Sequence, residues 1–207
     1  PVKQIWKDFS SGKGGTAITF LMEHEHFTYP EAIKYLANKY NIEIEETEQT
    51  DEQKIESDEK ESLFLVSEYA NKFFQKTLKE TDEGKSIGLS YFKERGFTEE
   101  TIKKFELGYS PKAKDAFSKA AIKKAYDKEI LVSSGLSLIN ESSDQIVDRF
   151  KERTMFPIQS YSGRTLGFGG RAFNPNAKAK YLNSPETLIY HKSKVLYGLN
   201  YSKNAIG

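Results

Sequence analysis

The stretch DRFKERTMFPI at residues 148–158 runs on through GRTLGFGGR at 163–171 to KYLNSPET at 180–187. The first two segments contain runs with the composition of β-strands, at residues 155–158 and 165–168, and residues 161–164 between these runs supply the turn of a hairpin. Glycines inside a strand usually mark the close approach of another backbone or a ligand. The sequence therefore predicts an antiparallel hairpin whose cations lie beside backbone that a ligand can approach closely.

The charge of the chain is unevenly distributed, although its formal net charge is only +1. Residues 41–62 contain ten acidic and two basic residues, whereas residues 148–207 contain ten basic and three acidic ones. A clustered excess of Lys and Arg attracts phosphates. The basic end is thus the candidate surface for phosphate-bearing partners.

The bulk composition is that of a soluble globular protein. The chain has 207 residues, 37% of them hydrophobic and 13% aromatic, which suffices for one sizeable core or two small ones. It has neither an apolar run of eighteen residues nor the residue order of a signal peptide, so membrane insertion and secretion are not indicated. The absence of cysteine excludes disulfides and Cys-ligated metal sites, and it fits a reducing cytosol.

The first 45 residues predict a strand and two helices. Residues 1–9 alternate loosely and suit a short strand, and a glycine-rich turn then ends it. Thr16 is a good N-cap for a short apolar helix, and Thr28 opens a second helix that ends near Asn41. Residues 46–62 are acidic, polar and free of aromatic residues, which predicts a flexible linker between two domains.

The sequence from residue 63 onward predicts helices followed by strands. Apolar residues recur at helical spacing from Leu63 to Leu78, and shorter helices are expected over 88–93, after Thr98 and over 113–126. Beyond Asp144 the composition changes to that of strands. The expected fold class is α+β, with a helical segment leading into a curved, mixed or antiparallel sheet.

Several familiar sites are not supported. The segment 12–16 lacks the spacing of a phosphate-binding loop, and no Gly-x-Ser-x-Gly motif marks a nucleophile. His24, His26 and His191 are too few and too separated to form a zinc site without cysteine. The carboxylates of the acidic segment belong to the predicted linker and lack the ordered backbone that a shared metal requires.

The basic residues of the final third allow two interpretations. Arg171 follows the glycines and can grip a phosphate with two parallel hydrogen bonds, while Lys180 and Lys192 add point charges. Tyr181 and Tyr190 can either stack on a base or fill a core. The alternative is a twisted hairpin with solvated cations, which charge alone does not exclude.

At these residues the chain resembles the bacterial replicative DNA primases of the DnaG type, over essentially its whole length. Two upstream segments, 91–96 and 104–109, resemble the helical start of that family's polymerase domain. The residues that carry the resemblance in the basic region are 148–150, 155–158, 163–164, 167–171, 180–187, 191–192 and 196–199.

The resemblance implies that residues 63–207 are the N-terminal subdomain of an RNA-polymerising core that makes short RNA primers on single-stranded DNA during replication. Its basic cleft would bind the template and ribonucleoside triphosphates. The positions that match the family's functional residues are Arg95, Arg171, Lys180, Tyr181, Asn183 and Lys192.

Residues 1–45 resemble the end of a zinc-ribbon domain that binds template, but the family's Cys-x-x-Cys pair is replaced by Asp8 and Ser11. Aspartate can bind zinc, whereas serine is a poor ligand. The hypothesis is therefore a remnant ribbon without metal, held by apolar packing around Ile5, Trp6, Phe9 and Phe20. Stoichiometric zinc in the purified full-length protein would contradict it.

The resemblance also implies that the chain is an internal fragment. The family's metal-binding carboxylates, which hold Mg²⁺ or Mn²⁺, lie in a TOPRIM subdomain that is expected after residue 207. The fragment alone should bind nucleic acid without polymerising. The implied partners of the whole enzyme are template, nucleotides, the RNA primer and, through a C-terminal region, the replicative helicase, in a bacterial cytoplasm near the nucleoid.

Two other functions remain open at this point. A non-catalytic module for binding single-stranded nucleic acid would keep Arg171 and Lys180 but would not be followed by metal-binding carboxylates. A helicase-contacting adaptor would use the apolar stripe from Leu63 to Leu78 as its docking surface.

Overall fold

The structure is a computed structural model that describes residues 5–25, 27–43, 51–140, 143–174, 177 and 179–206. The chain divides into two compact units, Pro1–Glu52 and Gln53–Gly207. Among the described residues, no helix has the length and apolar composition needed to span a bilayer.

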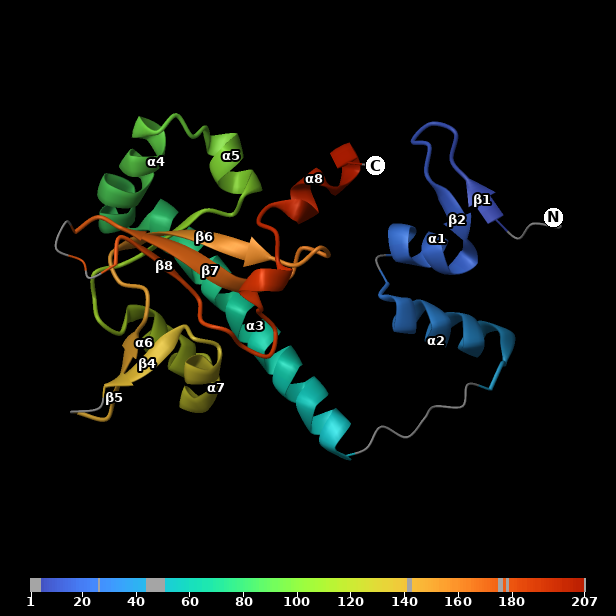
Figure 1. The fold of residues 1–207 in the computed structure, drawn as a ribbon, viewed down its shortest axis with the longest axis horizontal. Coiled ribbons are helices and arrows are strands. Elements are labelled where there is room, and N and C mark those ends of the chain that lie inside the picture. Colours follow the sequence, from blue (N-terminus) through green and yellow to red (C-terminus); the bar gives the residue numbers. More distant parts are fainter. Residues whose placement is uncertain are drawn as a thin grey trace. The chain divides into compact units, whose positions relative to one another are not determined.

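The first unit is a hairpin of two short strands followed by two helices (Figure 1). Thr16 caps the first helix by accepting a hydrogen bond from the backbone N–H of Thr19. Thr28 and Glu31 form a reciprocal capping box at the second helix, which ends where Asn41 adopts the left-handed conformation. The predicted strand, helices and caps are confirmed. The elements are β1 (Ile5–Lys7), β2 (Gly14–Thr16), α1 (Ala17–His24) and α2 (Tyr29–Tyr40).

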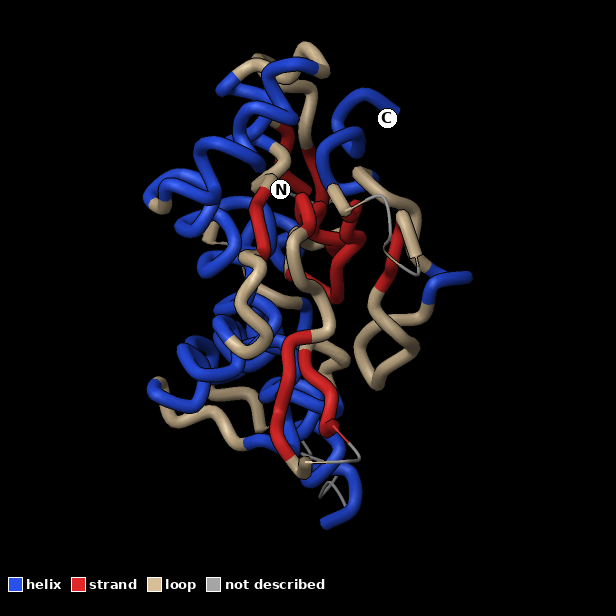
Figure 2. The backbone as a smooth tube through the Cα atoms, turned by 90° about the vertical axis from the view of Figure 1, so that its left-hand side faces the viewer, coloured by secondary structure: helices blue, strands red, loops and turns tan. Residues whose placement is uncertain are grey.

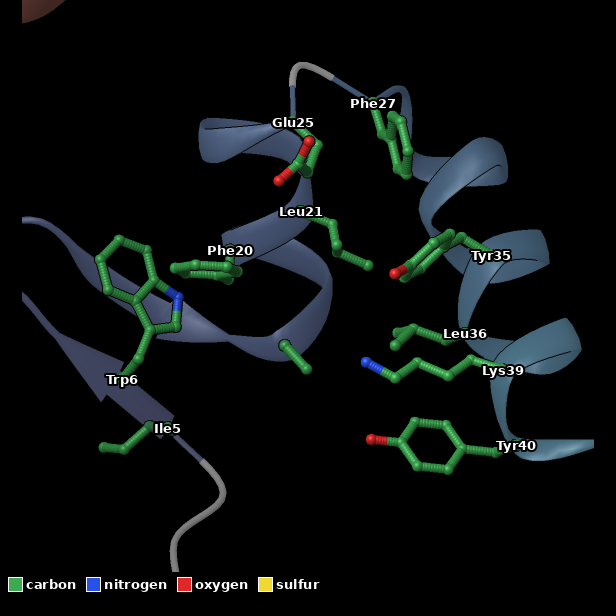
Figure 3. A pocket seen from close by; sticks show the side chains of 11 residues that line it. Ile5, Trp6, Phe20, Leu21, Glu25, Phe27, Tyr35, Leu36, Lys39 and Tyr40 are labelled. Atoms are coloured by element: carbon green, nitrogen blue, oxygen red, sulfur yellow. The ribbon is translucent and has the colours of Figure 1, made fainter.

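An aromatic pocket of about 520 Å³ lies within this unit, between β1, α1 and α2 (Figure 3). Trp6 meets Phe20 edge-on, with ring centroids 5.4 Å apart, and its indole N–H donates to the carbonyl of Thr16. The expected contribution of Phe9 is wrong, because Phe9 lies in the turn after β1 and is 88% exposed. Packing in this unit therefore rests on Trp6, Phe20 and the facing side of α2.

The second unit is organised on one long helix, α3 (Asp51–Glu80), which passes behind the sheet in Figure 1. The predicted apolar stripe is its buried face and contacts the sheet through Phe74, whose ring lies 5.3 Å from that of Phe168. The residues of this stripe, each at most 2% exposed, are Leu63, Val66, Ala70, Phe74 and Leu78.

The prediction of a flexible acidic linker over 46–62 is wrong for residues 51–62, which are the first turns of α3; residues 46–50 lie outside the described part. The end of this segment contacts a cation that is distant in the sequence. Arg164, in the β6–β7 turn, donates two hydrogen bonds of 2.8 Å to Glu61 and one of 3.1 Å to Glu68. Its guanidinium also lies 3.9 Å from the ring centroid of Phe64. These contacts lower the pKa of Glu61 and raise that of Arg164.

Four antiparallel strands form the central sheet in the order β3-β6-β7-β8. A separate hairpin, β4–β5, extends away from it (Figure 2). The predicted strand pair and its turn at 161–164 are confirmed, as is the α+β class. The strands are β3 (Gly108–Ser110), β4 (Ser137–Asn140), β5 (Gln145–Asp148), β6 (Arg153–Gln159), β7 (Thr165–Ala172) and β8 (Tyr181–Asn183).

Short helices surround the sheet. One group packs against β6 through Phe92 and Phe156, whose ring centroids are 5.7 Å apart. Another packs against the β4–β5 hairpin, where the buried carboxylate of Asp148 accepts hydrogen bonds from the first-turn N–H groups of Phe117 and Ser118. The remaining helical elements are η1 (Gly84–Leu89), α4 (Ser90–Glu94), α5 (Glu99–Lys104), α6 (Ala116–Lys123), α7 (Lys128–Ser133), η2 (Lys192–Lys194) and α8 (Leu199–Ile206).

Candidate nucleic-acid interface

The candidate interface begins with the two faces of strand β7. Successive side chains of a strand point to opposite faces, so Phe168 lies on the face covered by α3 and Arg171 on the other. The register places Thr154 of β6 and Tyr181 of β8 on either side of Arg171. Arg171 is therefore held at the centre of three strands, on the face that α3 does not cover.

The glycines of β7 differ in their surroundings. A Cβ added at Gly167 would lie 2.9 Å from Ser184, and one at Gly170 would lie 2.9 Å from Phe150, so both glycines are required by packing. A Cβ at Gly169 would meet nothing nearer than the amide oxygen of Asn183, at 3.3 Å. Gly169 is thus the least crowded of these three glycines, although an added Cβ would still press on the Asn183 side chain.

Arg95 and Arg171 come together on one aromatic ring. The guanidinium carbons lie 5.1 Å and 4.4 Å from the ring centroid of Tyr91, and that of Arg171 lies 5.6 Å from Phe173. Cation–π contact orients a guanidinium without neutralising its charge. Tyr91 was not among the residues predicted from the sequence. Its position four residues before Arg95 in a helical segment is the signal that marks it.

Lys180 and Tyr181 form a second group beside Arg171. The Lys180 ammonium lies 5.8 Å from the ring centroid of Tyr181, which is 68% exposed. The buried guanidinium of Arg153 donates to the backbone carbonyls of Ala179 and Lys180, at 2.9 and 3.3 Å, and burial lowers its pKa. Arg153 thus fixes the backbone that carries Lys180. The sequence does not reveal this role, because the partners of Arg153 are backbone carbonyls distant in the chain, those of Gly170, Ala179 and Lys180.

Asn183 and Lys192 lie at a third place on the same face. Both line a pocket of about 280 Å³ together with Gly169. Glu186 accepts a hydrogen bond from the backbone N–H of Lys192 at 3.0 Å and pairs with the ring of His191, which fixes the turn that carries Lys192. Tyr190 is only 2% exposed and belongs to the core, whereas Tyr181 is available for stacking.

The four predicted cations share one electrostatic property. Within the described part of the chain, none of them is ion-paired to a carboxylate, whereas Arg164 is paired to two. Cations without an ion-pair partner favour phosphate binding, because no paired acid has to be displaced. The four cations are Arg95, Arg171, Lys180 and Lys192. Lys192 differs in lying near Glu186, whose pKa is lowered by the Lys192 backbone N–H, by His191 and by the Lys192 charge.

Asp8 and Ser11 lie in the turn between β1 and β2. Asp8 accepts hydrogen bonds from the backbone N–H and hydroxyl of Ser10, at 2.9 and 2.8 Å, and from the hydroxyl of Ser11 at 2.5 Å. These bonds, with that from Ser11 the largest, lower the pKa of Asp8 to about 2. No group of three acidic or histidine side chains that could hold a metal occurs among the described residues. The turn does not fit a zinc ion.

The chain therefore combines a hairpin-and-helix unit with an α+β unit whose cations suit the phosphates of a nucleic acid. The sequence pattern of the CHC2 zinc finger matches residues 1–52, and that of the DNA primase catalytic core, N-terminal domain, matches residues 73–203. The chain belongs to the family of DnaG-type bacterial DNA primases.

Individual relatives agree with this assignment. The chain is 39% identical to a DNA primase of Halalkalibacterium halodurans, over all of the chain and 34% of that protein. The zinc-binding and RNA polymerase domains of the Aquifex aeolicus primase match with a TM-score of 0.63 and 29% identity, over all of the chain and 47% of that one. A DnaG primase catalytic domain bound to single-stranded DNA matches with a TM-score of 0.63 and 35% identity, over 72% and 45%. The chain spans about a third of the length of the curated relatives.

Proposed function

We propose that the chain is the template- and nucleotide-binding part of a DNA primase, which synthesises short RNA primers on single-stranded DNA. The observation that carries this proposal is the pair Arg95 and Arg171, stacked on one tyrosine with no carboxylate partner among the described residues. Phosphoryl transfer depends mainly on positioning and charge stabilisation, and a fixed pair of guanidinium groups serves both purposes. The DNA-bound relative supports single-stranded DNA as the ligand.

The proposed roles follow from position on the sheet. Arg95, Arg171 and Lys180 hold phosphates, and the exposed ring of Tyr181 stacks on a base. Asn183 and Lys192 act at the neighbouring pocket. In this proposal a nucleic-acid strand runs along these residues beside β7 and β8.

We assign residues 1–45 to a ribbon-like template-binding domain and 63–207 to the N-terminal subdomain of the polymerase core. In the parent enzyme, Mg²⁺ or Mn²⁺ would be held by a TOPRIM subdomain. The fragment alone is then one part of a nucleotidyltransferase. It binds nucleic acid but does not polymerise nucleotides. Nucleoside triphosphates, the primer and the replicative helicase are the proposed partners of the whole protein, in the bacterial cytoplasm at the nucleoid.

In this fold the apolar surface that a helicase-contacting adaptor would need is buried. The stripe from Leu63 to Leu78 would have to be exposed to dock a partner, and instead its apolar members are the core of the second unit. A module without catalysis is also disfavoured, because the relatives that cover the whole chain are DNA primases.

We propose further that the ribbon-like unit of this chain is held without zinc, by the hydrogen bonds of Asp8 and the Trp6–Phe20 contact. The purified chain should contain less than about 0.1 zinc per molecule, and EDTA should leave its Trp6 fluorescence melting curve unchanged. Asp8→Ala should lower the melting temperature of that curve, whereas Asp8→Asn, which keeps one acceptor oxygen, should lower it less. One bound zinc per chain would contradict the proposal.

The proposed function is tested by binding of single-stranded DNA to the chain, followed by fluorescence anisotropy at several salt concentrations. A cationic cleft predicts that the logarithm of the affinity falls linearly with the logarithm of salt, with a slope of about −0.7 for each phosphate contacted. Three to four contacts, one for each unpaired cation, should give a slope of about −2 to −3. Binding that is absent or independent of salt would refute the proposal.

A further inference from the structure

A groove of about 430 Å³ lies between helices α3 and α6, lined by α3 from Tyr69 to Thr81 and by Ala120 and Lys124 of α6. Its volume falls within the range of about 300–1,000 Å³ that is typical of ligand sites. Helix α3 packs on the face of the sheet that carries Phe168, and Arg171 lies on the opposite face. The α3–α6 groove is therefore separate from the candidate nucleic-acid interface.

The groove is long and narrow. Its α3 residues recur at intervals of three and four positions from Tyr69 to Thr81, so they form one stripe along the helix. Twelve positions of an α-helix extend over about 18 Å. A volume of about 430 Å³ spread along this stripe suits a row of side chains better than one compact ligand. An amphipathic helix that lies in an apolar groove presents such a row.

The rims of the groove are positively charged. Lys72 and Lys76 lie one helical turn apart on α3, and Lys124 faces them from α6. Lys76 reaches Glu80 only at 3.7 Å, whereas neither of the other two lysines has an ion pair within the described part of the chain. Three lysines and one glutamate leave a charge of +2. Like charges four positions apart destabilise a helix, so folding alone does not favour this pair.

The hydroxyl groups that line the groove already donate to the protein's own backbone. Thr77 donates to the carbonyl of Phe73 at 2.9 Å, and Thr81 donates to that of Thr77 at 2.7 Å. Tyr69 donates to the carbonyl of Ala120 at 3.2 Å. The rings of Tyr69 and Phe73 are half-buried, unlike the exposed ring of Tyr181. Recognition in this groove therefore depends on charge and apolar shape, and the edge of a nucleobase would find few partners.

We propose that the α3–α6 groove binds an acidic, amphipathic peptide segment of a partner protein. Apolar side chains of the segment lie between the two helices, and its carboxylates pair with Lys72, Lys76 and Lys124. Carboxylates four positions apart on a helical segment match the spacing of the two lysines on α3. Because the groove and Arg171 lie on opposite sides of the sheet, the partner can be held while DNA is bound. The inference goes beyond the proposed function.

The test measures how a labelled synthetic peptide of Glu, Ala and Leu, about 14 residues or four helical turns long, binds to the whole chain at low salt. Fluorescence anisotropy follows the binding. The double variant Lys72→Ala/Lys76→Ala should bind the peptide about five- to thirtyfold more weakly, as expected for the loss of two exposed ion pairs. The matched control, Lys79→Ala/Lys123→Ala, removes two exposed lysines that do not line the groove, and its affinity should change by less than about twofold.

Ala120→Leu fills the groove without changing its charge, and leucine is a good helix former. This variant should bind the peptide about tenfold more weakly, because one apolar anchor is displaced. Circular dichroism verifies the fold of every variant. Binding of a single-stranded DNA 12-mer should be the same in Ala120→Leu as in the wild type, and saturating DNA should leave the affinity for the peptide unchanged.

Two control peptides separate charge from shape, one with Gln in place of every Glu and one with Ala in place of every Leu. Both should bind more weakly than the parent peptide. The inference would be overturned if the wild-type chain did not bind the parent peptide, or if either control peptide bound equally well. A larger loss of DNA affinity in Lys72→Ala/Lys76→Ala than in Lys79→Ala/Lys123→Ala would also overturn it, because these lysines would then serve nucleic acid.

Discussion

Replacing Arg171 by alanine should weaken the binding of single-stranded DNA by about 10- to 100-fold at low salt, because a hydrogen bond to a charged group contributes about 1.5–3 kcal/mol. No carboxylate within the described residues competes for this guanidinium, so its hydrogen-bonding capacity is available to a phosphate. The negative slope of affinity against salt should become shallower by about 0.7 for each phosphate that the variant no longer binds.

Arg171→Lys separates charge from geometry. Lysine keeps the positive charge but cannot present two parallel donors or stack flat on Tyr91, so affinity should fall to an intermediate value while the salt slope stays near that of the wild type. The matched control is Lys119→Ala. Lys119 is exposed on α6, is paired to Asp115, and lies among the elements packed against the other face of the sheet. Equal reductions in affinity for Arg171→Ala and Lys119→Ala would mean that binding depends only on total charge.

Local signals in the sequence were sufficient for the elements that local chemistry determines. The caps at Thr16, Thr28 and Thr98, the hairpin turn at 161–164 and the buried stripe of α3 all occur as predicted. In each case the deciding partner lies within a few residues of the signal. The side-chain period of a helix and the turn chemistry of a hairpin are local properties.

The features that the sequence did not predict depend on contacts between residues far apart in the chain. The acidic segment is helical from residue 51, and the end of it is tied to the sheet by Arg164, about a hundred positions away, which pairs with Glu61. Helix α6 is capped by Asp148, thirty-one positions beyond Phe117. For the candidate site, the sequence identified the cations but not Tyr91, which brings two of them together, nor Arg153, which holds the backbone of a third. Composition reveals which charges are present, and only the fold reveals which remain unpaired.

The largest change in stability is expected for Phe74→Ala in α3, which should lower the free energy of unfolding of the second unit by about 3–5 kcal/mol. Phe74 is 2% exposed, and its ring lies 5.3 Å from Phe168 and 5.7 Å from Phe117. A Cβ added at Gly108 would come within 2.6 Å of the Cβ of Phe74, so backbone is already packed against this side chain. The surroundings cannot collapse into the space that the removed ring leaves.

Urea denaturation followed by near-ultraviolet circular dichroism of tyrosine measures this change, because the single tryptophan, Trp6, reports on the first unit. The control is Leu65→Ala on the same helix, which removes an apolar side chain that is 48% exposed and should cost less than about 1 kcal/mol. The comparison also decides between two uses of the apolar stripe. A docking surface would tolerate Phe74→Ala with little change in stability and fail to bind its partner instead, whereas a core position loses stability whether or not a partner is present. If Phe74→Ala were as mild as Leu65→Ala, α3 would not be the spine of this unit, and the sheet face carrying Arg171 would have no rigid support.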